Sequence, residues 1–127
     1  MTFARYTLCA LTLLFAGSLA ANEPATRSQP PPGEVMTLGK DVYLAKCAVC
    51  HKEDGVGGQA GAPSLVGNFR LRDERRVLEQ ILRGGQYMPG FAFLLTDTEI
   101  AAVASYIRNT WANSHGAVIE SQVAELR

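Results

Sequence analysis

Cys47-Ala48-Val49-Cys50-His51 is the stretch of this chain that carries the most specific chemistry. Two thiols lie three positions apart, and an imidazole follows the second thiol directly. Each thiol can add across a vinyl group of haem to form a thioether, and the adjacent histidine can then bind the iron. The motif therefore predicts one covalently attached haem c, held by Cys47 and Cys50, with His51 as an iron ligand.

Three other uses of paired thiols fit this chain less well. A dithiol redox centre usually follows a strand and opens a helix, whereas this motif closes a segment with helical periodicity. A structural zinc site needs four ligands, and beyond the motif the chain offers only Cys9 and His115. A disulfide between Cys47 and Cys50 is the third alternative, but it leaves His51 without a role.

The first 21 residues are typical of a secretory signal peptide. Arg5 supplies the positive charge, residues 8–16 form the apolar run, and Ser18-Leu19-Ala20 offers small residues for cleavage. We expect residues 1–21 to be removed and the mature protein to be periplasmic, because bacterial c-type haem is attached outside the cytoplasm. The apolar run is short for a membrane span, so a retained N-terminal anchor is the less favoured alternative.

The charge balance excludes a strongly basic protein. Twelve basic and twelve acidic side chains give a formal net charge of zero, and loss of Arg5 with the signal peptide would leave a slight acidic excess. A nucleic-acid binder of this size is normally strongly basic. A uniformly basic surface for docking acidic partners is excluded for the same reason.

Residues 22–35 are predicted to be a proline-rich linker, because Pro30-Pro31-Pro32 favours an extended polyproline conformation. A helix is predicted over residues 37–46, with Thr37 as its N-cap, and it would deliver the haem motif. Gly39 lowers the helix propensity of this segment. We therefore expect a close helix–helix crossing at Gly39, where only glycine leaves room for another backbone.

A glycine-rich loop is expected over residues 52–68. A histidine that binds a metal needs a hydrogen-bond acceptor for its second ring nitrogen. The backbone carbonyl near Pro63 is the candidate acceptor for His51. The alternative is that Pro63 only stiffens the loop.

A second helix is predicted over residues 74–83, with Asp73 as its N-cap and Gly84-Gly85 at its end. Arginines gather in and just before this helix, and we interpret them as a solvated face with carboxylate neighbours. The alternative is a docking patch, or one arginine that reaches a haem propionate. The cluster consists of Arg70, Arg72, Arg75, Arg76 and Arg83.

Met88 is predicted to be the second iron ligand. Electron-transfer haems fill the position opposite the histidine with a thioether or a second imidazole. Met88 precedes a proline, which favours extended backbone, and glycines on both sides let the chain approach a ring. Met36 should lie on a helix that leads away from this position, and His115 follows the last main helix. The alternative is that Met88 is an ordinary core methionine.

The clearest helix begins at a capping box, Thr96 with Glu99, and is predicted to run to about Trp111. Its small side chains permit close packing, so we expect this helix to cross the first helix at Gly39. Residues 36–112 are therefore expected to form a haem domain. Residues 113–127 are expected to form a C-terminal extension with one last short helix.

Together these stretches resemble the class I cytochrome c family, whose fold is all-α, with helices packed around one covalently bound haem. The resemblance covers roughly residues 38–111, and its elements come in the family's order. It is carried by Gly39-Lys40-Asp41-Val42-Tyr43 with Lys46-Cys47-Ala48-Val49-Cys50-His51, by Pro63-Ser64-Leu65-Val66-Gly67-Asn68, by Met88-Pro89-Gly90-Phe91 and by Ala104-Ser105-Tyr106-Ile107-Arg108.

A narrower similarity is to the haem domains and subunits that serve periplasmic dehydrogenases of alcohols, gluconate and related substrates. This chain has one Cys-x-x-Cys-His motif where the multi-haem members have several, so a single-haem partner subunit fits better than a direct quinone reductase. The similarity rests on Met88-Pro89-Gly90-Phe91, Leu95-Thr96-Asp97-Thr98-Glu99-Ile100-Ala101, Asn109-Thr110-Trp111-Ala112-Asn113 and Val123-Ala124-Glu125-Leu126-Arg127.

The resemblance implies an electron carrier and not an enzyme. It would accept single electrons from a periplasmic dehydrogenase and pass them to another cytochrome or a terminal oxidase. The residues near the motif include no paired acid and base for substrate chemistry. The alternative from another class is a haem enzyme or gas sensor, in which the sixth iron position is open or labile.

Overall fold

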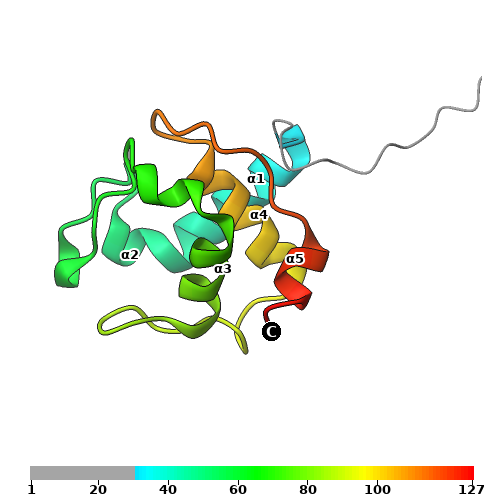
Figure 1. Ribbon diagram of the computed structural model, residues 1–127. Coiled ribbons are helices and arrows are strands. Elements are labelled where there is room, and N and C mark those ends of the chain that lie inside the picture. The colour runs from blue at the N-terminus through cyan, green and yellow to red at the C-terminus, as the bar shows by residue number, and fades with distance from the viewer. Residues whose placement is uncertain (1–30) are drawn as a thin grey trace, which may run out of the picture.

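The computed structural model describes residues 31–127, which form helices and loops, and this part of the chain contains no β-strand (Figure 1). The prediction of an all-α fold is confirmed. The predicted signal peptide and residues 22–30 of the predicted linker lie outside the described residues. The elements are α1 Gly33–Val42, η1 Tyr43–Cys47, α2 Ala48–His51, η2 Gln59–Gly61, η3 Phe69–Arg72, α3 Glu74–Arg83, α4 Asp97–Arg108 and α5 Glu120–Ala124.

Helix α1 begins at Gly33, inside the predicted linker, so the prediction of a start at Thr37 is wrong. Pro32 occupies the N-cap, and its carbonyl accepts the first helical hydrogen bond from Met36 N at 3.1 Å. A proline is tolerated there because its missing N–H is not needed before a helix. Thr37 lies within the helix, where its hydroxyl donates to Gly33 O at 3.0 Å.

The first helical segment also continues past its predicted end at Lys46. A π-helical turn, η1, follows α1 directly and leads into α2, which contains most of the haem motif. Tyr43 in η1 is fully buried, and its hydroxyl donates to Lys52 O at 2.6 Å. Burial raises the pKa of Tyr43 well above its usual value. Single π-helical turns are common at functional sites and leave no separate periodicity in the sequence.

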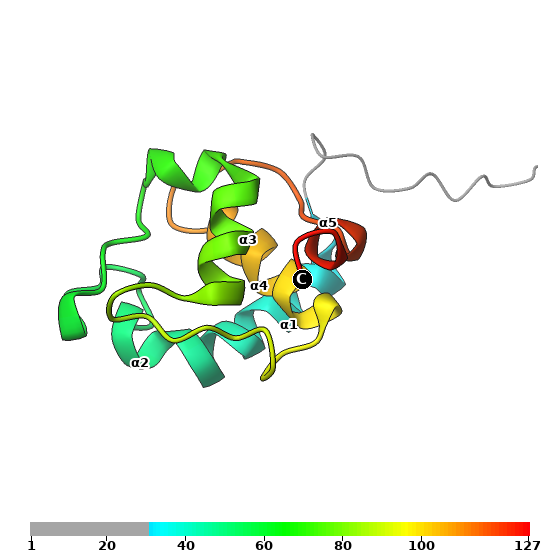
Figure 2. The ribbon, with the colours of Figure 1, turned by 60° about the horizontal axis from the view of Figure 1, so that its bottom comes forward.

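Helices α1 and α4 cross where the sequence predicts a close approach (Figures 1 and 2). A Cβ atom added to Gly39 would lie 2.2 Å from Ala102 O and 2.7 Å from Tyr106 Cβ. Both distances are shorter than any tolerated contact, and neither neighbour can swing away, because one is backbone and the other is a Cβ atom. Gly39 is therefore required for this crossing.

Replacing Gly39 by alanine is expected to lower the free energy of unfolding of the haem-loaded protein by about 3 kcal/mol, because the two helices must separate. Urea denaturation followed by far-UV circular dichroism measures this loss. Gly33→Ala in the same helix is the matched control, since no atom of residues 31–127 lies within 4 Å of the added methyl group. Equal stability of the two variants would contradict the close crossing.

The predicted caps of α3 and α4 are confirmed. Asp73 accepts a hydrogen bond from Arg76 N at 3.1 Å, and Thr96 and Glu99 form the complete capping box. Helix α4 ends at Arg108, before the predicted end at Trp111. The reason is local, because Asn109 donates its side-chain amide to Ser105 O at 2.8 Å and leaves the helical conformation.

The C-terminal extension packs on the rest of the domain and contains the expected short helix, α5. Val123 in α5 is fully buried, and Gln122 donates to Glu74 Oε1 at 2.6 Å. The buried Arg108 guanidinium donates to His115 O at 2.7 Å, and its Nε donates to Leu71 O at 2.9 Å. These contacts connect the extension to the beginning of α3.

Candidate haem site

A cavity of about 390 Å³ lies among α2, the loops on either side of α3, and the inner faces of α3 and α4. Every site residue predicted from the sequence lines it, although these residues come from separate segments of the chain. The competing iron ligands that the sequence offered, Met36 and His115, are not part of the lining. The predicted site residues in the lining are Cys47, Cys50, His51, Pro63 and Met88.

Cys47 and Cys50 are presented by the end of η1 and by α2, and both thiols are free. Burial, reinforced by the neighbouring Cys50, raises the pKa of Cys47 to about 11. Cys47 is therefore a neutral thiol at pH 7. Two free thiols at this spacing, both at the cavity wall, are the groups that thioether attachment of haem requires.

His51 has the hydrogen-bond partner that the sequence suggested. Its Nδ1 atom lies 3.1 Å from Pro63 O. A carbonyl oxygen can only accept, so Nδ1 carries the proton and Nε2 keeps its lone pair in the neutral ring. This contact fixes the tautomer and the ring orientation that an iron ligand needs.

Gly57 allows the loop that carries Pro63 to approach His51. Its φ is +71°, its N–H donates to His51 O at 2.9 Å, and a Cβ atom there would lie 2.6 Å from Pro63 O. A larger residue would push the accepting carbonyl away from the imidazole. Gly57 is thus required for the support of His51.

Asn113 is a supporting residue that the sequence did not reveal. Its side-chain amide is buried and donates to Leu65 O at 2.8 Å and to Ile107 O at 2.9 Å. Its Oδ1 accepts from Asn68 N at 3.0 Å. The amide thereby attaches the loop that follows Pro63 to the end of α4. A single asparagine after a helix signals only a helix end, so no sequence pattern points to this role.

Asn113→Ala is expected to lower the free energy of unfolding by about 3 kcal/mol, because two carbonyls and one N–H lose their buried partner. Thermal unfolding of the haem-loaded protein, followed at the haem absorption band, measures the effect. The exposed neighbour Ser114 provides the control Ser114→Ala, which should unfold like the wild type. A wild-type midpoint for Asn113→Ala would show that these hydrogen bonds are dispensable.

Met88 lies on the loop between α3 and α4 and packs against the core. Its sulfur accepts a weak hydrogen bond from Gln80 Nε2 at 3.6 Å, and its carbonyl accepts from Gly85 N at 2.8 Å. Gln80 also lines the cavity, so the thioether is held at the cavity wall. Gln80 is a second residue whose role the sequence did not reveal.

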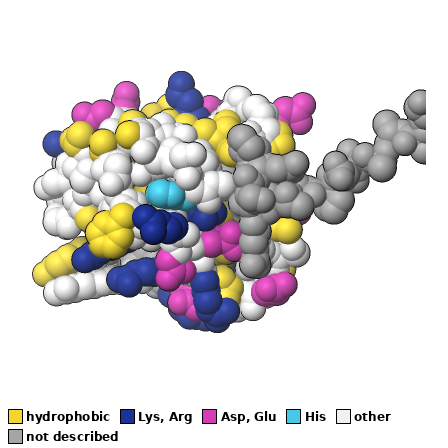
Figure 3. Space-filling model, turned by 45° about the horizontal axis from the view of Figure 1, so that its top comes forward, with side chains coloured by type: hydrophobic (Ala, Val, Ile, Leu, Met, Phe, Trp, Pro, Cys, Tyr) yellow, Lys and Arg dark blue, Asp and Glu magenta, His cyan; other side chains and the backbone are white. Residues whose placement is uncertain are grey.

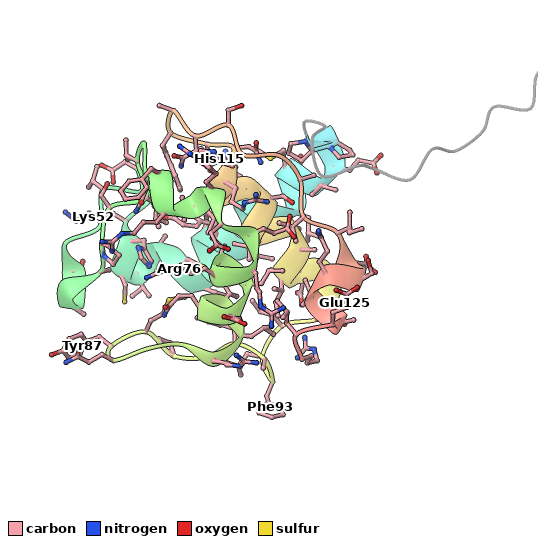
Figure 4. The ribbon with its side chains drawn as sticks, in the orientation of Figure 1. Lys52, Arg76, Tyr87, Phe93, His115 and Glu125 are labelled. Atoms are coloured by element: carbon pink, nitrogen blue, oxygen red, sulfur yellow. The ribbon has the colours of Figure 1, made fainter. Side chains whose placement is uncertain are left out.

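The remaining lining is mostly apolar and carries positive but no acidic side chains. The arginines of the cluster fall into two groups, one at the cavity and one on the exposed side of α3. Arg70 and Arg76 line the cavity, and Figure 4 shows Arg76 on the side of α3 that faces α2. Arg75 and Arg83 instead pair with Glu79 on the exposed side, at 3.0 and 3.7 Å. Apolar walls, two thiols, an imidazole, a thioether and positive groups for carboxylates together fit haem c.

Clusters of metal-binding side chains and membrane-spanning helices are both absent from residues 31–127. No group of three or more histidine, cysteine, aspartate and glutamate side chains in that range is arranged to hold a metal ion. None of the helices described there is both long enough and apolar enough to cross a bilayer.

Comparisons with known proteins find similarity to cytochromes. Residues 34–107 match the family described as "Cytochrome C oxidase, cbb3-type, subunit III". The chain is 31% identical over 120 residues to the cytochrome c subunit of the quinone alcohol dehydrogenase of Gluconacetobacter polyoxogenes. That alignment covers 83% of this chain and 26% of the relative, so the chain spans about a quarter of the length of that subunit.

Two shorter relatives are matched over most of their length. Cytochrome c6 of Diacronema lutheri is 36% identical over 74 residues, which cover 54% of this chain and 88% of that protein. The solved structure of cytochrome c6 from the diatom Phaeodactylum tricornutum superposes with a TM-score of 0.51 at 28% identity. The superposition covers 60% of this chain and 93% of the diatom chain. The arrangement of helices around the cavity is therefore that of a cytochrome c fold.

Proposed function

This chain belongs to the cytochrome c family, and we propose that it serves in electron transfer as a periplasmic single-haem carrier. The observation that carries the proposal is the cavity that gathers both thiols, the oriented imidazole and the thioether. Haem c, when bound there, supplies an iron that takes up and releases one electron. In this proposal Cys47 and Cys50 hold the porphyrin, and His51 and Met88 bind the iron.

A carrier is favoured over a haem enzyme or gas sensor because the cavity lining offers both an imidazole and a thioether, which would be the two iron ligands. His51 is oriented by Pro63 O, and the loop that bears Met88 is hydrogen-bonded to α3. If His51 and Met88 both bound the iron, no position would be left for a substrate or gas. Little would then have to move on electron transfer, which would favour a rapid reaction.

Positive side chains at the cavity would complete the haem site. Arg70 and Arg76 line the cavity, and none of the acidic residues between positions 31 and 127 does. We assign them to the two carboxylates of haem c, because guanidinium groups pair with carboxylates in planar, bidentate geometry. The other arginines of the cluster stay on the solvated face, as the sequence predicted.

The partners proposed are a periplasmic dehydrogenase as donor and another cytochrome or a terminal oxidase as acceptor. The similarity to a cytochrome subunit of alcohol dehydrogenase supports the donor, and the family description supports an oxidase as acceptor. The face shown in Figure 3 carries positive and negative side chains close together, so no single-sign patch dominates it. This agrees with the zero net charge and with the exclusion of a nucleic-acid partner.

Anaerobic mixing with a quinone-dependent alcohol dehydrogenase depleted of its own cytochrome subunit tests the proposal. Oxidised haem-loaded protein and ethanol are added, and the reduced haem spectrum is followed. We expect reduction by one electron per haem, at a rate proportional to the enzyme concentration. Reduction by dithionite but by no tested dehydrogenase would contradict the proposed donor. Cell fractionation with N-terminal sequencing tests the periplasmic location, and a mature start near Asn22 is expected.

A further inference from the structure

The loop between α3 and α4 is attached firmly at the end that carries Met88. Phe91 N donates to Ile81 O at 2.9 Å, and Ala92 N donates to Leu82 O at 3.2 Å. These two bonds attach residues just after Met88 to the end of α3. The contacts of the residues after Ala92 determine how firmly the other end of the loop is held.

Beyond Ala92 the chain turns outward and loses contact with the core. Phe93 is 102% exposed and Leu94 is 66% exposed, and Figure 4 shows Phe93 pointing away from the domain. Neither side chain can hold the turn by burial. Leu95 then returns to the core, where it is 7% exposed, directly before α4 begins.

Two backbone hydrogen bonds close this turn, because Leu94 N and Leu95 N donate to Phe91 O at 2.9 and 3.0 Å. One side chain from the far end of the sequence reinforces it. Nη1 of Arg127 donates to Ala92 O, Nη2 donates to Leu95 O at 3.0 Å, and Nε donates to Asp97 Oδ1 at 2.7 Å. The guanidinium thus bridges both sides of the turn and the first residue of α4. Figures 1 and 2 both show the chain end beside the start of α4.

Arg127 is itself held in place. Leu126 packs against the core, Val123 is fully buried, and Gln122 donates to Glu74 Oε1 at 2.6 Å. The planar fork of arginine loses little freedom when it bonds several acceptors, because its geometry is already fixed. The packed segment of residues 122–126 therefore holds the Arg127 guanidinium beside the turn.

We propose that Arg127 is a positioning residue for Met88, which acts by closing the loop that brings the thioether to the iron. The inference rests on the proposed ligand role of Met88. A ligand on a loop fixed at both ends has a high effective concentration at its target, and this falls when one end is released. Loss of Arg127 removes the three side-chain hydrogen bonds that tie Ala92, Leu95 and Asp97 to the C-terminal segment. The loop then opens more often, and the thioether leaves its position more often.

Imidazole binding to the oxidised, haem-loaded protein measures this opening, because imidazole competes with Met88 for the iron. Arg127→Gln is expected to raise the affinity for imidazole about tenfold, within the range of coupling found between contacting groups. Arg127→Lys keeps the charge near Asp97 but loses the fork, and it should lie between the wild type and Arg127→Gln. Arg75→Gln is the matched control, since Arg75 is exposed on α3 and pairs with Glu79, far from the turn in the sequence.

Imidazole affinity is then compared between Met88→Ala and the double variant Met88→Ala with Arg127→Gln. This comparison separates a positioning role of Arg127 from a general structural role. If Arg127 acts through Met88, its loss changes nothing once Met88 is gone. An equal rise of imidazole affinity in the Met88→Ala background would overturn the proposal, as would wild-type affinity in Arg127→Gln. If Met88→Ala itself binds imidazole no better than the wild type, the proposed ligand role fails instead.

Discussion

Replacing both Cys47 and Cys50 by serine is expected to leave the haem-free chain largely unfolded. The cavity that they line measures about 390 Å³ and is mostly apolar, and buried core residues form part of its wall. At roughly 24 cal/mol per Å³, an enclosed void of this size would cost about 9 kcal/mol, and the cost here is smaller because the cavity is partly open to solvent. That upper value is comparable with the entire stability of a small domain, about 5–15 kcal/mol.

Far-UV circular dichroism of the purified, haem-free double variant during heating checks this prediction. We expect reduced helix content and no sigmoidal transition. Cys50→Ser alone is the control, because one remaining thioether should retain haem and permit folding. A cooperative thermal transition in the haem-free double variant would contradict the prediction and would show that α1, α3 and α4 form a sufficient core by themselves.

Met88→Ala is expected to lower the reduction potential by on the order of 100 mV, a modest part of the roughly 0.8 V over which axial ligands tune haem. The thioether favours ferrous iron, so its removal stabilises the ferric form. The ferrous variant should also bind carbon monoxide rapidly, because the sixth position becomes open. Potentiometric titration and absorption spectra measure the two effects.

Met36→Ala is the matched control for this experiment. Met36 lies on α1 and is not part of the cavity lining, so its removal should change neither the potential nor carbon monoxide binding. An unchanged potential in Met88→Ala, together with no carbon monoxide binding, would mean that another group binds the iron. Gln80, which donates to the Met88 sulfur, would then have only a packing role.

Features that depend on short spacings could be predicted from the sequence. The caps at Asp73 and at Thr96 with Glu99 depend on contacts within one helical turn, so local residue types determine them. The crossing at Gly39 was predictable because a glycine destabilises the middle of a helix, and a close contact with another backbone offsets that cost. The haem motif was predictable because its chemistry needs that spacing.

Features that depend on single long-range side chains could not be predicted. Asn113 reaches backbone atoms of the loop after Pro63, and Arg127 reaches the loop after Met88. Such contacts leave no periodic pattern, since one asparagine or arginine can bond almost any exposed carbonyl. The early start of α1 was not predictable either, because the prolines before Gly33 fit an extended linker. Proline is equally compatible with the residue before a helix.

Absorption spectra of the haem-loaded protein test the closed two-ligand haem site most directly. The spectra are recorded for the oxidised protein, for the reduced protein, and for the reduced protein under carbon monoxide. A carrier with both His51 and Met88 on the iron predicts low-spin spectra in both redox states and no rapid change on addition of carbon monoxide. A rapid shift with carbon monoxide would show an open or labile sixth position. That result would contradict a closed electron carrier and would favour a haem enzyme or gas sensor.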